Sequence, residues 1–322
     1  MPTRIQQGVL DWLLEPDQPV VRFNTLTHLL GCSRNSEEVR KAYSKIPKVG
    51  WSHEILAGQK PGGYWDSRED LYRPKYTATI WKLIVLADLG LTAKDDRIRK
   101  PCEFFLKEYA KPDGGFDTPG DSPRSELCIT GNVAKALLLC GYDEDSRVLA
   151  AFDWLVENQK DDGGWHCFPN RVHGTLDCWE GLSAFAALPK RKWTRRIKRS
   201  VERGAEFYLA RQLFREGRKR YLPWFRFHYP VHYYYDLLVG LDVITRLGYA
   251  DDRRLKAALQ ILKDKRRPDD TWALDAVHPD LGLGAGYRFK KRPKPFALEK
   301  QGKPSKWITL TALRVLKRVE EA

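Results

Sequence analysis

The chain has 322 residues, of which 42% are hydrophobic and 12% aromatic, so it can form one large domain or two ordinary ones and is not a disordered chain. The mean hydropathy of -0.54 and the lack of an apolar run near about 20 residues exclude an ordinary transmembrane helix. With 56 Lys and Arg against 42 Asp and Glu, the net charge of +14 favours anionic partners, namely nucleic acid, membrane headgroups or phosphorylated small molecules.

Two kinds of helical pattern alternate along the chain. Amphipathic patterns predict one set of helices, at 5–14, 37–46 together with 51–58, 97–109, 147–159, 195–212 and 253–265. Four of these follow residues of the N-cap type, which are Asp95, Asp145, Thr194 and Asp251. More apolar patterns, most of which end at Gly or Pro, predict a second set at 20–30, 76–89, 127–140, 173–188, 231–247 and 307–319.

A glycine–aromatic turn recurs between the helices. It reads GGYW at 62–65, GGF at 114–116 and GGW at 163–165. The second glycine therefore recurs at intervals of 52 and 49 residues, and about two further intervals lead to Trp272, where the glycine pair is absent. This period of about 50 residues predicts a repeat made of one helix pair.

Six polar-faced helices that alternate with six apolar helices predict two layers. We therefore expect an all-α fold, an α/α toroid of six inner and six outer helices, with residues 1–322 as a single domain. An open solenoid is the alternative. In a ring, the long outer-to-inner connections and the N-termini of the inner helices lie on one face, so we expect an anion-favouring site there.

Two of the predicted inner helices begin with the same pattern, H-x-x-x-D. The pairs are His173 with Asp177, and His232 with Asp236. Residues four apart share one face of a helix, so both pairs are expected to point into the same end of the ring. Because His and Asp in a partly buried cavity can act as general acids or bases, we predict catalytic roles for these four residues. The alternative is that the histidines only cap helices or hydrogen-bond in a polar cavity.

The repeat turns carry a resemblance to a known family. The segments KPDGGF at 111–116 and QKDDGGW at 159–165 resemble the turns of the terpenoid cyclase and protein prenyltransferase α/α toroid, and the second is similar to the Q-W repeat of squalene-hopene cyclases. The segment GKPSKWITL at 302–310 resembles small squalene-cyclase-like proteins of bacteria and archaea. The resemblance covers nearly the whole chain. It implies a prenyltransferase- or cyclase-like protein with a central pocket for an isoprenoid or another amphipathic anionic substrate.

The acidic motifs of terpene cyclases are not complete in this sequence. The segment DEDS at 143–146 is one carboxylate short of D-x-D-D, and DDRIR at 95–99 ends in Arg where D-D-x-x-D requires Asp. We therefore do not expect ordinary squalene cyclisation.

Cysteines near the H-x-x-x-D pairs suggest a metal. Zinc takes three or four N, S or O ligands, and protein prenyltransferases hold it with an Asp, a Cys and a His. By this resemblance, Asp177 or Cys178 with His232 is the counterpart, and Cys128 begins the preceding inner helix. We therefore predict a zinc site at Cys128, Cys178 and His232. The alternative is that the two cysteines pack as small apolar groups.

Aromatic residues are predicted to line the pocket. Trp81, Trp179, Tyr233 and Tyr234, together with Glu126, are the predicted substrate-binding residues. The rings can hold an isoprenoid chain or stabilise a carbocation. The alternative is that they brace neighbouring repeats. Paired carboxylates such as Glu126 and Asp177 also leave open a carbohydrate-active α/α-barrel enzyme.

Basic charge concentrates in two segments. Residues 189–220 hold 13 Lys or Arg against three Glu, and residues 266–306 hold ten basic and five acidic residues. A solvated outer face explains such charge, and an anionic membrane surface is an alternative partner. Nucleic acid is a further one, although no nucleic-acid-binding module is recognisable. A non-catalytic toroid that binds a lipid, a protein or nucleic acid is therefore the second functional hypothesis.

The first ten residues lack the charged-then-apolar pattern of a secretion signal, which favours a cytoplasmic location. The six cysteines fit that compartment as reduced thiols. None belongs to a Cys-x-x-Cys pair, so a zinc ribbon or a thioredoxin-type motif is not indicated.

Overall fold

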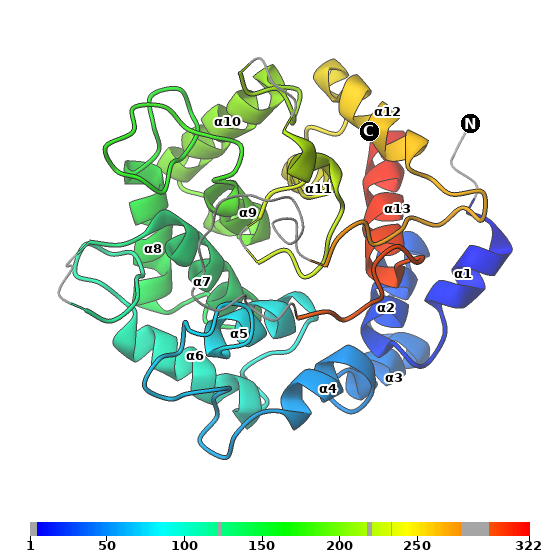
Figure 1. The fold of residues 1–322 in the computed structure, drawn as a ribbon, viewed down its shortest axis with the longest axis horizontal. Coiled ribbons are helices and arrows are strands. Elements are labelled where there is room, and N and C mark those ends of the chain that lie inside the picture. Colours follow the sequence, from blue (N-terminus) through cyan, green and yellow to red (C-terminus); the bar gives the residue numbers. More distant parts are fainter. Residues whose placement is uncertain (1–4, 121–123, 218–220, 233, 278–295) are drawn as a thin grey trace. The chain divides into compact units, whose positions relative to one another are not determined.

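The computed structural model describes residues 5–120, 124–217, 221–232, 234–277 and 296–322 (Figure 1). Within these ranges the regular structure is helical, and β-type pairing is limited to isolated bridges such as that between Ala110 and Phe116. The predicted all-α fold class is therefore confirmed. None of the helices in the described ranges is both long and apolar enough to cross a bilayer.

The chain divides into two compact units. The first comprises 1–58, 221–231 and 236–322, and the second comprises 59–220 and 232–235. The single domain expected for 1–322 stays a prediction.

The second unit has the predicted pairs of inner and outer helices. Its inner helices α5 (Thr79–Asp88), α7 (Leu127–Cys140) and α9 (Glu180–Ala187) pack in series, α5 on α7 and α7 on α9. The outer helices α6 (Asp96–Glu108), α8 (Ser146–Glu157) and α10 (Arg195–Ala210) pack against them, and a short 3₁₀ turn, η2 (Lys190–Lys192), precedes α10. Apolar residues are buried on all sides of α5 and α7, whereas α6 and α10 bury one stripe and expose their charged faces.

The first unit is organised around its C-terminal helix, α13 (Lys306–Glu321). This helix packs against α1 (Gln7–Leu13), α2 (Pro19–Asn24), the π-helical turn η1 (Thr25–Leu29) and α11 (Leu237–Leu247). Arg318 on α13 donates to Asp242 Oδ1 of α11 at 2.9 Å and to Thr245 Oγ1 at 2.7 Å. The unit also contains α3 (Glu37–Lys45), α4 (Gly50–Ala57), η3 (Leu222–Phe225), η4 (Arg253–Leu255) and α12 (Lys256–Asp264).

The aromatic residue of each repeat turn is buried and tied to a helix. Phe116, Trp165 and Trp272 have no exposed surface. The indole N–H groups of Trp165 and Trp272 donate to the carbonyls of Leu155 and Leu262, at 2.9 and 2.8 Å. Threonine hydroxyls accept the backbone N–H groups of three of the turns, in the pairs Trp65 with Thr79, Phe116 with Thr130 and Trp272 with Thr309. These contacts support the bracing interpretation for the turn aromatics.

Several inner helices begin later than predicted. The segments 76–89, 173–188 and 231–247 become helical only at Thr79, Glu180 and Leu237. Tyr76 and His232 have positive φ angles of 73° and 52°, which a right-handed helix cannot contain. The predicted N-caps Asp95, Asp145 and Thr194 are confirmed, each accepting a backbone N–H of its helix. The cap expected at Asp251 is instead Asp252, and a 3₁₀ turn precedes α12.

Candidate functional site

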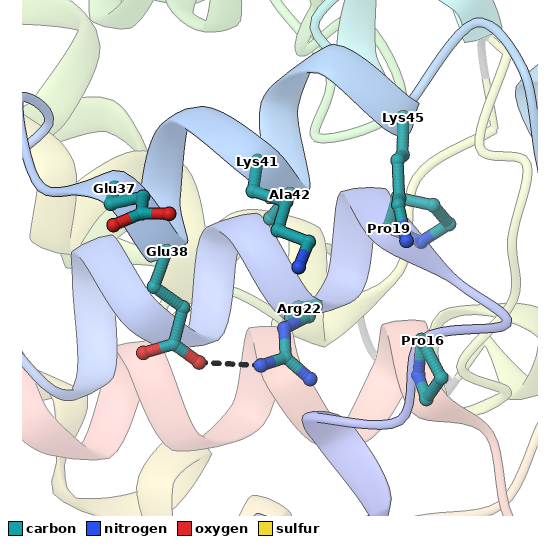
Figure 2. A pocket seen from close by; sticks show the side chains of 8 residues that line it. All are labelled: Pro16, Pro19, Arg22, Glu37, Glu38, Lys41, Ala42 and Lys45. Carbon is teal, nitrogen blue, oxygen red and sulfur yellow. Dashed lines mark hydrogen bonds and ion pairs between the residues drawn. The ribbon is translucent and has the colours of Figure 1, made fainter.

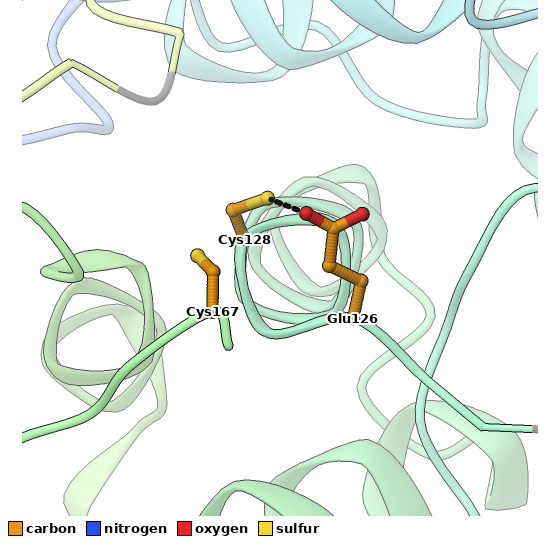
Figure 3. Close-up of side chains that lie close together, drawn as sticks. All are labelled: Glu126, Cys128 and Cys167. Carbon is orange, nitrogen blue, oxygen red and sulfur yellow. Dashed lines mark hydrogen bonds between the residues drawn. The ribbon is translucent and has the colours of Figure 1, made fainter. Parts of the chain in front are cut away.

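Three potential metal ligands meet at the start of α7 (Figure 3). Glu126 is the N-cap residue of this helix, and Cys128 is in its first turn. Cys167 comes from the loop that follows the glycine–aromatic turn at 163–165. Their ligand atoms all lie within 4.8 Å of one another, and the Cys128 thiol is 3.1 Å from Glu126 Oε1. We call Glu126, Cys128, Cys167 and the adjacent Cys178 the thiol–carboxylate cluster.

Cys178 and Glu180 extend this arrangement toward α9. The sulfur of Cys178 lies 3.4 Å from that of Cys167 and accepts the backbone N–H of Cys167 at 3.3 Å. Glu180, the first residue of α9, is 2% exposed, and its Oε2 atom has no hydrogen-bond partner in the described part of the chain. Burial raises the pKa of the Glu180 carboxyl well above its usual value.

The thiols of the cluster influence one another's protonation. Interactions with the neighbouring Cys128 and Cys178 side chains hold the pKa of Cys167 well below its usual value. The same interactions, together with burial, raise the pKa values of Cys128 and Cys178. Burial also raises the pKa of Glu126.

A cavity of about 410 Å³ lies next to the cluster, with Cys167 in its wall. Two long loops, at 111–126 and 160–172, contribute to it. It offers the cations of Arg124 and Lys160 beside the apolar surfaces of Leu127 and Trp154. Its other lining residues are Asp113, Ser125, Glu157, Asn158, His166 and Pro169.

An aromatic cluster lies in the same unit. The ring of Trp81 is 5.1 Å from Tyr72, 5.4 Å from Tyr76 and 5.4 Å from His232. The hydroxyl of Tyr234 is 3.3 Å from that of Tyr76. Burial raises the pKa of Tyr72, and the nearby Cys128 and Glu126 raise it further. Tyr72 therefore links the aromatic cluster with the thiol–carboxylate cluster.

The two predicted H-x-x-x-D pairs are not on helices. His173 and Asp177 lie in the loop before α9 and are exposed, with 81% of the His173 side chain accessible and its Nδ1 3.7 Å from Asp162. The expectation that each pair shares a helix face is therefore wrong, because both helices begin after the pair. Catalytic roles for the four residues stay predictions.

Asp236 pairs with His228, which is not among the predicted site residues. It is the N-cap of α11, where it accepts the backbone N–H groups of Val239 at 2.9 Å and His228 at 3.0 Å. Its Oδ2 lies 2.8 Å from His228 Nδ1, and both side chains are 1% exposed. His232, also buried, packs instead against Tyr76 and Trp81.

The remaining predicted substrate-binding and metal-binding residues lie in different parts of the structure. Trp179 is buried at the N-terminus of α9, and Trp81 is buried in α5. Tyr233 lies outside the described residues. The group of potential metal ligands among the described residues contains Cys128 with Glu126 and Cys167, whereas the other two predicted ligands, Cys178 and His232, are not part of it. The predicted ligand set did not include Cys167, because a loop cysteine has no fixed spacing to α7, although its position just after a repeat turn places it near the predicted site.

A second cavity, of about 430 Å³, lies in the first unit (Figure 2). Arg22, Lys41 and Lys45 line it together with Glu37 and Glu38, and Arg22 is paired with Glu38. Both acidic and basic side chains therefore line its wall, and its lining contains no Cys or His. Its other lining residues are Pro16, Pro19 and Ala42.

Similar solved structures include type II terpene cyclases. One is the enzyme MstE from Scytonema without ligand, with 17% identity, a TM-score of 0.45, and coverage of 94% of this chain and 88% of that chain. A variant of MstE in complex with merosterolic acid A, a product, has 16% identity and a TM-score of 0.47, with coverage of 98% and 99%. A protein from Actinoplanes has 17% identity and a TM-score of 0.46, with coverage of 96% and 90%. No protein-family model and no curated protein matches the chain.

Proposed function

We propose that the protein is a prenyltransferase- or cyclase-like enzyme that holds a zinc ion with Glu126, Cys128 and Cys167 and acts on an isoprenoid or another amphipathic anion. The observation that carries this proposal is the approach of the three ligand atoms to within 4.8 Å of one another beside a cavity.

The chemistry of the donor set fits zinc. Thiolate and carboxylate ligands suit this ion, and ligand thiols must lose their protons to bind it. The low pKa of Cys167 assists that loss. Cys178 offers a further sulfur, and the buried Oε2 of Glu180 is an acceptor whose burial a cation would offset. When bound, zinc would supply a Lewis acid or a lowered pKa for a bound thiol or water.

The lining of the cavity fits an amphipathic anion. Arg124 and Lys160 can pair with a negatively charged head, and Leu127 and Trp154 offer apolar surface to a hydrocarbon tail. In the same unit, Tyr72, Tyr76, Trp81, His232 and Tyr234 pack on one another as the aromatic cluster.

Metal analysis of the purified full-length protein tests the zinc site. We expect one equivalent of zinc in the wild type and its loss in Cys128→Ser and Cys167→Ser. Cys102→Ser is the matched control, because Cys102 is a fully buried thiol of the same unit outside the cluster. Cobalt substitution should give the intense sulfur-to-cobalt absorption bands of thiolate ligands. Wild-type protein without zinc, which also fails to bind added zinc or cobalt, would exclude the site.

Calorimetric titration with geranylgeranyl diphosphate tests the anion pocket. We expect Lys160→Gln to weaken binding about tenfold, because a charge-assisted contact is lost. Lys198→Gln is the control, since Lys198 is an exposed cation of α10 that does not line the cavity. Equal weakening by the two variants would mean that the probe senses only the overall positive charge.

A further inference from the structure

In the second unit, the pair of Cys167 and Cys178 combines a short distance between the two sulfur atoms with access to a cavity. Their sulfurs are 3.4 Å apart, and Cys167 is in the wall of the cavity of about 410 Å³. We propose that these two cysteines are a site of oxidative modification, at which a hydroperoxide reaches Cys167 and Cys178 completes a disulfide. The proposal concerns the metal-free protein and does not depend on the proposed function.

The geometry allows the bond with a small movement. A disulfide needs sulfurs about 2.05 Å apart, so the two atoms must approach by a little more than 1 Å. Both cysteines lie in the loop between the glycine–aromatic turn and α9, where no helix fixes their backbones. Cys128, in contrast, is held in the first turn of α7, and its thiol lies 3.1 Å from Glu126. Cys178 is therefore the favoured partner of Cys167.

The reaction balances with a hydroperoxide as the only added reagent. The sulfur of Cys167 attacks one peroxide oxygen, the O–O bond breaks, and the thiol proton leaves in water, which gives a sulfenic acid. The sulfur of Cys178 then attacks the sulfenic sulfur, the S–O bond breaks, and the hydroxyl group leaves as water with the Cys178 proton. Two thiols are oxidised by two electrons, and hydrogen peroxide is reduced to two waters.

The chain contains an internal control. Cys102 and Cys140 also lie close together, since an interaction with Cys140 raises the pKa of Cys102. Both are buried, at 0% and 2% exposure, and neither lines the cavity beside Cys167. If closeness of the two thiols were sufficient, both pairs would be oxidised. If a peroxide must also reach one of the thiols, only Cys167 and Cys178 are expected to react.

Peptide mapping of the full-length protein after chelation and treatment with hydrogen peroxide tests the proposal. Trypsin cleavage after Lys160, Arg171 and Lys190 separates the peptide of Cys167 from that of Cys178. We expect these two peptides to be joined by a disulfide, at a rate about tenfold or more above any oxidation of Cys102 or Cys140. In Cys178→Ser, dimedone should label Cys167, and in Cys128→Ser the Cys167–Cys178 disulfide should still form.

Three outcomes would overturn the proposal: a Cys128–Cys167 disulfide in the wild type, oxidation of Cys102 at the same rate, or no reaction at Cys167. The same map with zinc added separates this proposal from the metal site. Protection of Cys167 by zinc would support both. Oxidation with and without zinc would exclude the metal site and leave the thiol pair in place.

Discussion

Asp236 is a buried carboxylate that accepts two backbone N–H groups. It also lies 2.8 Å from the buried His228 imidazole. We expect Asp236→Ala to lower the free energy of unfolding by about 2–4 kcal/mol, because it removes a helix cap and leaves buried donors unpaired. Asp145→Ala, which removes the cap of α8 at a less buried site, should cost only about 1 kcal/mol. Guanidinium denaturation measures both, and equal losses would contradict the role assigned to burial.

Lys82 is a buried cation on the inner helix α5, and its titration should be visible in stability. Burial lowers its pKa to about 8 from the usual 10.5, although Asp66 raises it in part. Between these two pH values the unfolded chain binds the proton and the folded chain does not, so stability rises with pH across this window.

We therefore expect Lys82→Met to be more stable than the wild type below pH 8, and the advantage to shrink by about 3 kcal/mol by pH 10.5. Urea denaturation of both proteins at a series of pH values measures the difference between their free energies of unfolding. The contributions of the other titrating groups are common to both proteins and cancel in this difference. A constant difference across the range would mean that Lys82 keeps its ordinary pKa in the folded state.

At the scale of elements, the repeat turns offer a matched pair of glycines. Gly114 and Gly163 occupy equivalent positions and have positive φ angles of 95° and 88°. A Cβ atom on Gly163 would lie 2.4 Å from the Arg203 carbonyl oxygen of α10, whereas one on Gly114 would meet the Ala150 carbonyl at 3.5 Å. A side chain at position 163 therefore adds a backbone clash to the conformational strain, whereas one at position 114 does not.

We expect Gly114→Ala to cost about 1 kcal/mol, the usual penalty for a left-handed backbone, and Gly163→Ala to cost about 2–4 kcal/mol. Thermal and guanidinium unfolding of the two variants measure the difference. Equal costs would show that α10 moves away from the turn without penalty.

Element by element, the sequence predicted most of the helices because their apolar periodicity reflects burial directly. The prediction for α7 matches its observed bounds, and the caps at Asp95, Asp145 and Thr194 are confirmed. The predicted starts of some helices are wrong where apolar and aromatic residues continue into the loop before the helix. His232 is an example, because its positive φ angle places it outside the helix. The thiol–carboxylate cluster could be predicted only in part, since Cys167 reaches Cys128 through the path of a loop, which periodicity does not encode.

At the scale of the whole molecule, the position of the cluster gives a test of the single-domain prediction. Glu126, Cys128 and Cys167 all belong to the second unit, and α13 belongs to the first. A ligand that binds only the folded state raises the free energy of unfolding of every segment that unfolds cooperatively with the binding site. The increase is about 4 kcal/mol when the free ligand concentration is a thousand times the dissociation constant. Amides that exchange only through global unfolding report this change residue by residue.

We therefore expect added zinc to slow hydrogen exchange of the slowest amides in α13 as much as those in α7, if residues 1–322 are one cooperative domain. Mass spectrometry of peptides from both helices, with and without zinc, measures the two changes. Cys167→Ser should show neither change, which ties the effect to the cluster. Slower exchange in α7 with an unchanged α13 would mean that the two units unfold independently, and the single-domain prediction would then be wrong while the zinc site stands.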